Sequence, residues 1–183
     1  SGRSQMTLYS RELGLAPPPF SISPNPRPQL ELLSSEEISH SDMLSLTCPD
    51  ADVIHLQHSE TENVVKVNRF PTGFPEINDQ DQMVSMLKYV TTSNEYKTMV
   101  QSENVRADFE YFWVDCAGSK ERARSLMANF YGRAEQANRS FSVRGEGWKS
   151  DRGLIHMIYG PPSHIMHLMD REIWFFGAEQ AEN

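Results

Sequence analysis

The chain has 183 residues, and its 25 acidic and 17 basic residues give a formal net charge of −8 at pH 7. This acidic balance argues against nucleic acid as a partner, because phosphate backbones are bound by basic surfaces. The hydrophobic fraction of 38% and the mean hydropathy of −0.55 are typical of a polar globular domain. We expect no transmembrane segment, since no stretch approaches the roughly 20 apolar residues that a spanning helix needs.

The first 29 residues are expected to form an extended, proline-rich arm or linker. Six of the eleven prolines lie in two runs, Ala16-Pro17-Pro18-Pro19 and Ser23-Pro24-Asn25-Pro26-Arg27-Pro28. Because proline lacks a backbone donor and fixes φ, this density favours extended chain outside a compact core. A polyproline ligand for an aromatic groove is the alternative. No apolar leader opens the chain, which starts at Ser1 and reads like a fragment of a longer protein.

Residues 30–75 are expected to form a β unit of short strands. Four segments are rich in β-forming residues that alternate at period two, namely 30–33, 43–46, 53–58 and 64–70. The polar residues 59–63 predict a hairpin loop between the last two. The alternation places His55 and His58 on opposite faces of a strand, which argues against a metal site there. The turn-rich segment 71–78 predicts a domain boundary.

Residues 79–141 are expected to be helical. A first helix begins near Asp79, a second runs from about residue 102 to Gly118, and a third begins at Ser119 as its N-cap. The connection between the last two helices is so short that they should pack as an antiparallel hairpin. We expect five aromatic rings to form the core of this hairpin, Phe109, Phe112, Trp113, Phe130 and Tyr131.

Neither metals nor cofactors are expected from the cysteine and histidine spacing. Cys116 falls on the apolar face of the second helix, so a buried free thiol is favoured over a disulfide with Cys48. No cysteines and histidines recur at zinc-binding spacing. His164 and His167 are three apart on an expected strand and therefore point to opposite faces.

Residues 142–177 are expected to form a three-stranded antiparallel meander. Its strands are 154–159, 163–169 and 173–176, separated by a Gly160-Pro161-Pro162 turn and an Asp170-Arg171-Glu172 turn. Such a sheet needs cover on at least one face, and the helical hairpin is the available cover. The expected fold class is therefore α+β. A β-rich N-terminal piece is followed, within residues 76–183, by a helical hairpin packed on a three-stranded antiparallel sheet.

One motif in this region resembles a known family. Gly147-Trp148-Lys149-Ser150-Asp151-Arg152-Gly153, followed by Tyr159-Gly160-Pro161-Pro162, resembles the signature of the GWxTD-domain family of Bacteroidetes and their relatives. The family pattern is Gly-Trp-x-Thr-Asp-Arg-Gly, then a strand and a Gly-Pro-Pro-Asp turn. Ser150 replaces the usual Thr and keeps the hydroxyl, whereas Ser163 replaces the usual Asp and loses a carboxylate. The similarity covers roughly residues 75–177.

The resemblance implies a location in the cell envelope, periplasmic or attached to the outer membrane as a lipoprotein, and no established activity. The chain also contains no Gly-x-Ser-x-Gly elbow, P-loop or GxGxxG motif. We therefore expect a non-catalytic domain that acts in protein–protein interaction or assembly, with a protein partner of unknown identity. The alternative is a hydrolase or carbohydrate-binding domain that uses Trp148, Asp151 and Arg152.

The same three residues have structural interpretations. We predict that the Asp151 carboxylate accepts backbone amides in its own loop, and that Arg152 reaches an acidic side chain or carbonyls on a helix. Trp148 is expected to cover the core, with a platform for stacking a sugar or peptide as the alternative. An open cleft in which Asp151 and Arg152 converge with a third polar group would favour the enzyme.

Overall fold

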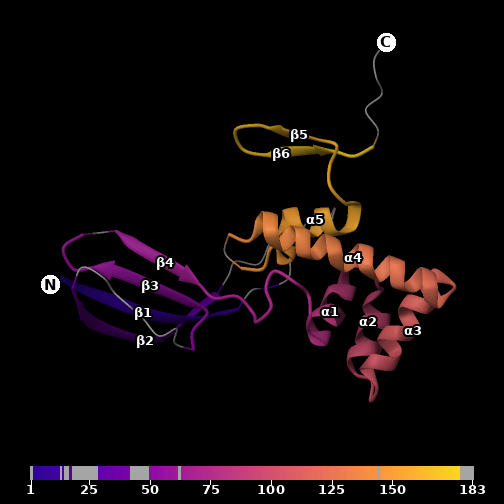
Figure 1. Cartoon of the computed structure of the whole chain (residues 1–183), viewed down its shortest axis with the longest axis horizontal. Helices are drawn as coiled ribbons and strands as arrows, with labels where there is room; N and C mark the ends of the chain where they lie inside the picture. Colours follow the sequence, from indigo (N-terminus) through magenta and orange to yellow (C-terminus); the bar gives the residue numbers. More distant parts are fainter. Residues whose placement is uncertain are drawn as a thin grey trace, which may run out of the picture.

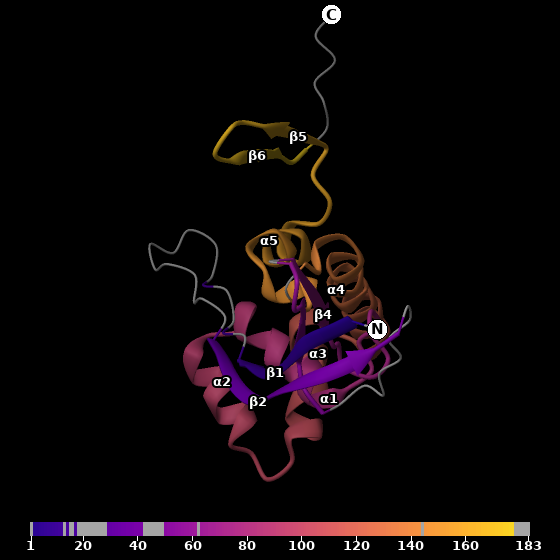
Figure 2. The ribbon, with the colours of Figure 1, turned by 90° about the vertical axis from the view of Figure 1, so that its left-hand side faces the viewer.

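The computed structural model describes residues 2–12, 14, 17, 29–41, 50–61, 63–143 and 145–177. A four-stranded sheet leads into a body of helices, and the helices carry a two-stranded hairpin near the C-terminus (Figure 1). In two perpendicular views, α4 and α5 lie between this hairpin and helices α1–α3 (Figure 1, Figure 2). The fold is α+β, as expected.

The N-terminal sheet is antiparallel, with the strand order β2-β1-β3-β4. Its strands are β1 (Gly2–Glu12), β2 (Gln29–His40), β3 (Val53–His58) and β4 (Val64–Asn68). The β3–β4 hairpin matches the prediction, with Val53 opposite Asn68 at its open end. The strand predicted at 30–33 extends much further as β2, whereas the strand predicted at 43–46 lies outside the described residues.

Strand β1 corrects the prediction of an arm over residues 1–29. Residues 2–12 pair with both β2 and β3 and so form an inner strand of the sheet. Across the β1–β3 ladder, Met6 faces Leu56 and Leu8 faces Ile54, and such apolar cross-strand pairs stabilise a sheet. The proline runs that follow suggest an extended arm, and the partners of β1 lie at least 17 residues away along the chain, so local sequence does not reveal the strand.

The helices begin and end close to where their capping residues predict. They are α1 (Gln80–Met86), the short 3₁₀ helix η1 (Leu87–Tyr89), α2 (Ser93–Val100), α3 (Val105–Ala117) and α4 (Lys120–Phe141). Asp79 caps α1 by accepting the Gln82 N–H, and Ser119 caps α4 by accepting the Arg122 N–H. Gly118 ends α3 with a φ of 74°, a left-handed conformation that favours glycine.

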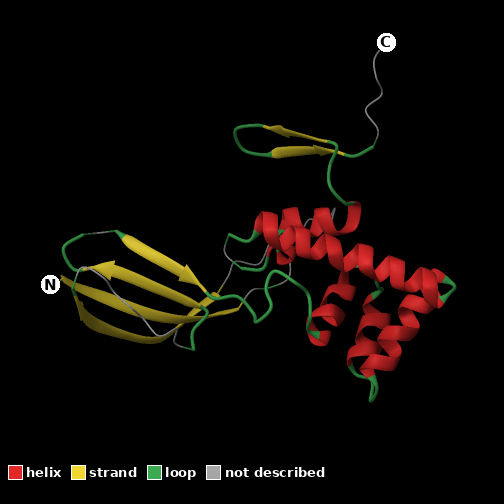
Figure 3. Ribbon diagram, in the orientation of Figure 1, coloured by secondary structure: helices red, strands yellow, loops and turns green. Residues whose placement is uncertain are grey.

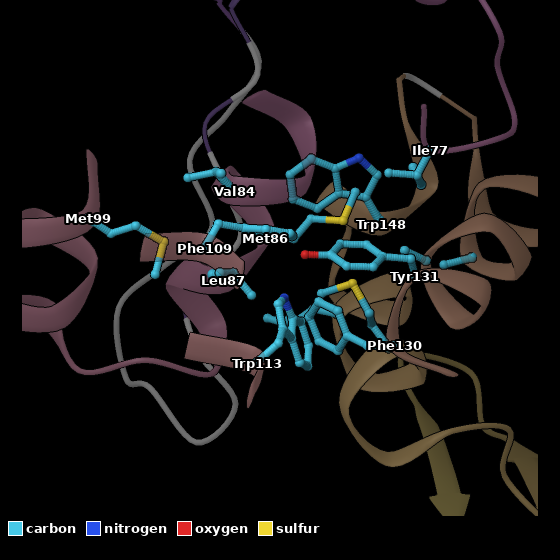
Figure 4. Packing of buried hydrophobic residues seen from close by; sticks show 14 of the residues in the cluster. Ile77, Val84, Met86, Leu87, Met99, Phe109, Trp113, Phe130, Tyr131 and Trp148 are labelled. Atoms are coloured by element: carbon cyan, nitrogen blue, oxygen red, sulfur yellow. The ribbon is translucent and has the colours of Figure 1, made fainter. Parts of the chain in front are cut away.

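The core lies where the α3–α4 hairpin meets α1, η1 and the motif region (Figure 4). Four of the five predicted rings are buried in it, Phe109, Trp113, Phe130 and Tyr131, whereas Phe112 is partly buried against them. Aromatic edges meet faces within this cluster, which favours the arrangement beyond the burial alone. The predicted aromatic core is therefore confirmed.

Cys116 corrects a second prediction. It was expected to be a buried thiol, but its side chain is exposed. Cys116 lies in the last turn of α3, near the tip of the α3–α4 hairpin, where the helix projects from the body (Figure 1). Val114 and Ala117 of the same turn pack against the core, so Cys116 lies on the flank of α3 that does not face the core.

The predicted three-stranded meander is wrong in its first strand. The described residues after α4 form the 3₁₀ helix η2 (Gly147–Lys149), the helix α5 (Asp151–Tyr159) and the strands β5 (His164–His167) and β6 (Glu172–Phe175). A short apolar run does not distinguish strand from helix by periodicity. Here Leu154 and Met157, one helical turn apart, are both buried, so packing against α4 favours the helix (Figure 3).

Candidate functional site

The motif residues 147–153 form the joint between η2 and α5. The Ser150 hydroxyl donates to the Gly147 carbonyl at 2.6 Å and accepts the Gly153 N–H at 3.1 Å, which makes Ser150 the N-cap of α5. Threonine could make both bonds, because each needs only a hydroxyl on Cβ. This pair of contacts gives a physical reason for a hydroxyl residue at position 150.

The two glycines of this joint lie where backbones touch. A Cβ at Gly147 would stand 2.0 Å from the Ala137 carbonyl oxygen on α4. A Cβ at Gly153 would stand 1.9 Å from the carbonyl oxygen of Gly147. The neighbouring atoms belong to backbone and cannot rotate away, so α4, η2 and α5 can approach this closely only with glycine at both positions.

Trp148 is fully buried, with 0% of its surface exposed, and it offers no ring face to a ligand. Its indole N–H donates to Glu146 Oε1 at 3.1 Å, and its backbone N–H donates to Asn138 Oδ1 at 3.4 Å. The Glu146 carboxylate also accepts the side-chain amide of Gln82 and pairs with Lys149. The indole therefore belongs to the core, and buried polar partners fix its orientation.

Glu146 and Asn138 are important residues that the sequence reading missed. Glu146 precedes the motif by one residue, and a glutamate in a glycine-rich loop normally indicates a solvated charge. Asn138 lies on α4 and also donates to the Pro75 carbonyl at 2.9 Å, which ties the start of the helical region to η2. Its position four residues after Ala134, on the apolar face of the predicted helix, was the signal that the sequence offered.

Asp151 and Arg152 occupy the first turn of α5. Asp151 is its first residue, where a carboxylate interacts favourably with the helix dipole. Burial, and secondly the charge of Asp151, raise the pKa of the Tyr89 hydroxyl. The N-cap of α5 is Ser150, one residue earlier, and the predicted acceptance of backbone amides by Asp151 stays a prediction.

Arg152 reaches an acidic side chain, but the acid lies on β6 and not on a helix. Its Nε and Nη2 donate to the two carboxylate oxygens of Glu172 at 2.9 and 2.8 Å. Glu172 also accepts the Trp174 indole N–H at 3.1 Å, and His167 Nδ1 lies 3.2 Å from its Oε1. One carboxylate thus connects α5 to both strands of the C-terminal hairpin.

The second half of the motif ends α5 and leads into the hairpin. Gly160 has a φ of 84°, and its N–H donates to the His156 carbonyl at 2.8 Å. Pro161 and Pro162 follow, and proline commonly stands just beyond a helix end. The ring of Tyr159 lies 5.5 Å from that of Phe176, centroid to centroid, so the end of α5 contacts the residue that follows β6.

A pocket of about 770 Å³ lies between α5 and the C-terminal hairpin. One face of α5 lines it through Asp151, Arg152, Ile155 and Tyr159, opposite residues 167–172, 174 and 176. Both charged residues of the motif therefore border an open space, although the Arg152 guanidinium is already paired. Within the described residues, no group of three histidine, cysteine or acidic side chains could hold a metal ion.

The family model of the GWxTD domain matches residues 53–183. The chain belongs to the GWxTD-domain family. The match begins at β3, upstream of the resemblance read from the motif, so the β3–β4 hairpin is part of the matched region of this GWxTD domain. Searches among curated proteins and among solved structures find no match. No helix in the described part of this GWxTD domain is both long and apolar enough to cross a membrane.

Replacing the cap of α5 tests the role of the hydroxyl. We expect Ser150→Ala to lower the free energy of unfolding by about 1 kcal/mol, because the Gly153 N–H loses its acceptor. Ser150→Thr, the residue of the family pattern, should stay within a few tenths of a kcal/mol of the wild type. Urea denaturation followed by circular dichroism measures both. Equal stability of the alanine variant would contradict this account of the motif.

Acidification should loosen the contact between the hairpin and α5. The pKa of Glu172 is lowered from its ordinary value of 4.5, first by the Trp174 hydrogen bond and then by Arg152 and His167. The charged carboxylate therefore stabilises the folded state fully above the ordinary pKa, and this contribution is lost as the pH falls through the lowered one. We expect hydrogen-exchange protection of β5 and β6 amides to fall between about pH 5 and pH 3.

The matched control for this pH dependence is Glu172→Gln. It should have weakly protected hairpin amides already at the higher pH and show little further change on acidification. A fall of the same size in the glutamine variant would assign the pH dependence to other groups.

Proposed function

We propose that this GWxTD domain is a non-catalytic interaction module of the bacterial cell envelope, and that its C-terminal hairpin binds a protein partner. The exposed apolar surface of that hairpin carries the proposal. In the ladder, Met166 faces Ile173 and His164 faces Phe175, on the face opposite to the one that packs towards α5. Met166, Ile173 and Phe175 are all exposed, and Met169 at the tip is 108% exposed.

Two physical arguments support a partner at this surface. An isolated two-stranded hairpin is marginally stable in water, so one that is apolar on both faces gains from a second covering layer. Contiguous exposed apolar side chains on a soluble domain are typical of interaction sites. The envelope location in this proposal is supported by the family resemblance, and a protein partner is also consistent with the acidic net charge.

The alternative function, a hydrolase or a carbohydrate-binding domain, has one observation in its favour. Asp151 and Arg152 line the same pocket, together with His167. However, Arg152 is held by Glu172 and the Trp148 ring is fully buried, so two of the three residues of that alternative are engaged in internal contacts. The interaction module is therefore the better-supported function.

Site-specific photo-crosslinking in cells that produce the full-length protein tests the proposal. A photoreactive phenylalanine analogue at Met169 should crosslink to one discrete protein partner. The same analogue at Val143, which is 76% exposed beyond the end of α4, serves as the matched control and should give no such product. Equal crosslinking from both positions, or none from Met169, would count against the proposal.

A further inference from the structure

One edge of the C-terminal hairpin is free to pair with another strand. The Leu168 N–H donates to the Arg171 carbonyl, and the Ser163 N–H donates to the Phe175 carbonyl, both at 2.8 Å. Along an antiparallel strand, the backbone N–H and C=O groups of successive residues point alternately to the two neighbouring sides. Because Arg171 and Phe175 point theirs towards β5, Glu172 and Trp174 point theirs away from β5. In the described part of the chain this sheet has only β5 and β6, so these groups form an unpaired edge.

The pocket borders this same edge. Glu172 and Trp174 of β6 line it, opposite Ile155 and Tyr159 of α5. A strand added beside β6 would extend the sheet over α5, and every second side chain of that strand would point into the pocket. The volume of about 770 Å³ is enough for several side chains and falls in the range of ordinary ligand sites.

The charges around the pocket favour an uncharged occupant. Arg152 is paired with Glu172, and Arg171 is paired with Asp170 at 2.7 Å. Asp151, the third acid of the lining, is engaged in contacts of its own. A charged side chain entering the pocket would have to compete with one of these existing interactions, whereas an apolar one would pack on Ile155 and Tyr159. A second copy of the chain is disfavoured, since each copy carries a net charge of −8.

We infer that the partner supplies an extended, uncharged segment that pairs with the outer edge of β6 and places alternate apolar side chains in the pocket. This inference rests on the proposed function and names its binding mode, the addition of a strand to a sheet edge. Main-chain hydrogen bonds to residues 172 and 174 supply affinity in this mode, and the pocket supplies specificity.

Selection from a phage-displayed library of random heptapeptides tests the inference. Enriched peptides should be uncharged and should carry apolar residues at every second position. The same selection against Ile155→Lys, which places a charge on the floor of the pocket, should not enrich them. Leu126→Lys on α4 is the matched control, because Leu126 is 42% exposed and does not line this pocket, and it should enrich the same peptides.

The best selected peptide then tests strand pairing directly. Methylation of its alternate edge-facing amides should weaken binding by about tenfold or more, which corresponds to about 1.4 kcal/mol. Bound peptide should also protect the amides of Glu172 and Trp174 from hydrogen exchange. Circular dichroism of Ile155→Lys, compared with the wild type, checks that the variant is folded.

Three results of the selection would overturn the inference, namely enrichment of charged peptides, enrichment of peptides with apolar residues at helical spacing, or no enrichment at all. Two later results would do the same, namely equal binding of the methylated and unmethylated peptides, or dimerisation of the protein through the hairpin, measured by light scattering. If any of these results were obtained while Met169 still crosslinked to a partner, only strand addition would be rejected and the proposed interaction function would be retained. If Met169 also failed to crosslink, strand addition and the interaction function would both be rejected.

Discussion

Gly153→Ala is expected to destabilise the domain by about 3 kcal/mol or more, at or above the upper end of the overpacking range. The added Cβ would stand 1.9 Å from the Gly147 carbonyl oxygen, 2.6 Å from its carbon and 2.9 Å from the Trp148 Cα. All three atoms belong to backbone, so relief requires a shift of η2 or α5 as a whole. Either shift would disturb Trp148 and Leu154, which are both buried in the core.

Gly132→Ala is the matched control for this substitution. Gly132 lies in the interior of α4, and a Cβ there would meet nothing within 4 Å. Alanine should therefore raise the free energy of unfolding by about 0.5–1 kcal/mol, because it restricts the unfolded chain and favours the helix. Urea denaturation of the two variants should shift the midpoint in opposite directions. A Gly153→Ala variant as stable as the wild type would disprove the close approach of the two backbones.

Trp148→Ala is expected to cost about 3–5 kcal/mol, the range for deleting a large buried aromatic side chain. The indole has no exposed surface and packs within the same cluster as Met86, Leu87 and Tyr131. Its removal also takes a hydrogen-bond donor from the buried Glu146 carboxylate. Unfolding should be followed by circular dichroism, since the substitution removes one of the three tryptophans that a fluorescence measurement would report.

Trp174→Ala provides the comparison within the same chain. Trp174 is only partly buried, and it lies on β6 near Phe141. Its loss should loosen the hairpin and lower the stability of the helical body by much less than the loss of Trp148. If both variants were equally destabilised, the hairpin would be part of the main cooperative unit, and the motif tryptophan would have no special place in the core.

Local chemistry in the sequence determined the caps and the helical hairpin. Asp79, Ser119 and Gly118 act on the backbone within a few residues of themselves, so their roles do not depend on the rest of the fold. A short connection joins α3 to α4, so each helix could be expected to bury its aromatic stripe against the other. The β3–β4 hairpin was predictable for the same reason, since its strands are neighbours in the sequence.

The motif at residues 147–153 was recognisable, but the roles of its residues were not. The sequence places a hydroxyl, a carboxylate and a guanidinium side by side, and each could cap a loop or pair with a distant charge. The structure assigns the cap to Ser150 and pairs Arg152 with Glu172, 20 residues later. Gly147 and Gly153 allow backbones to pack closely against each other, a role that neither amino-acid composition nor hydrophobic periodicity reveals.

Tertiary contacts alone decided the remaining features. Residues 151–159 are apolar at positions that suit either a strand or a helix, and burial of Leu154 and Met157 in the core selects the helix. β1 is a strand because distant residues pair with both of its edges, whereas Cys116 is exposed because it lies on the flank of α3 that does not face the core, next to Ala117, which does. The physical reason is common to all three. Burial and strand pairing are properties of segments brought together by folding, and the free energy of those contacts exceeds the weak local preference of either segment.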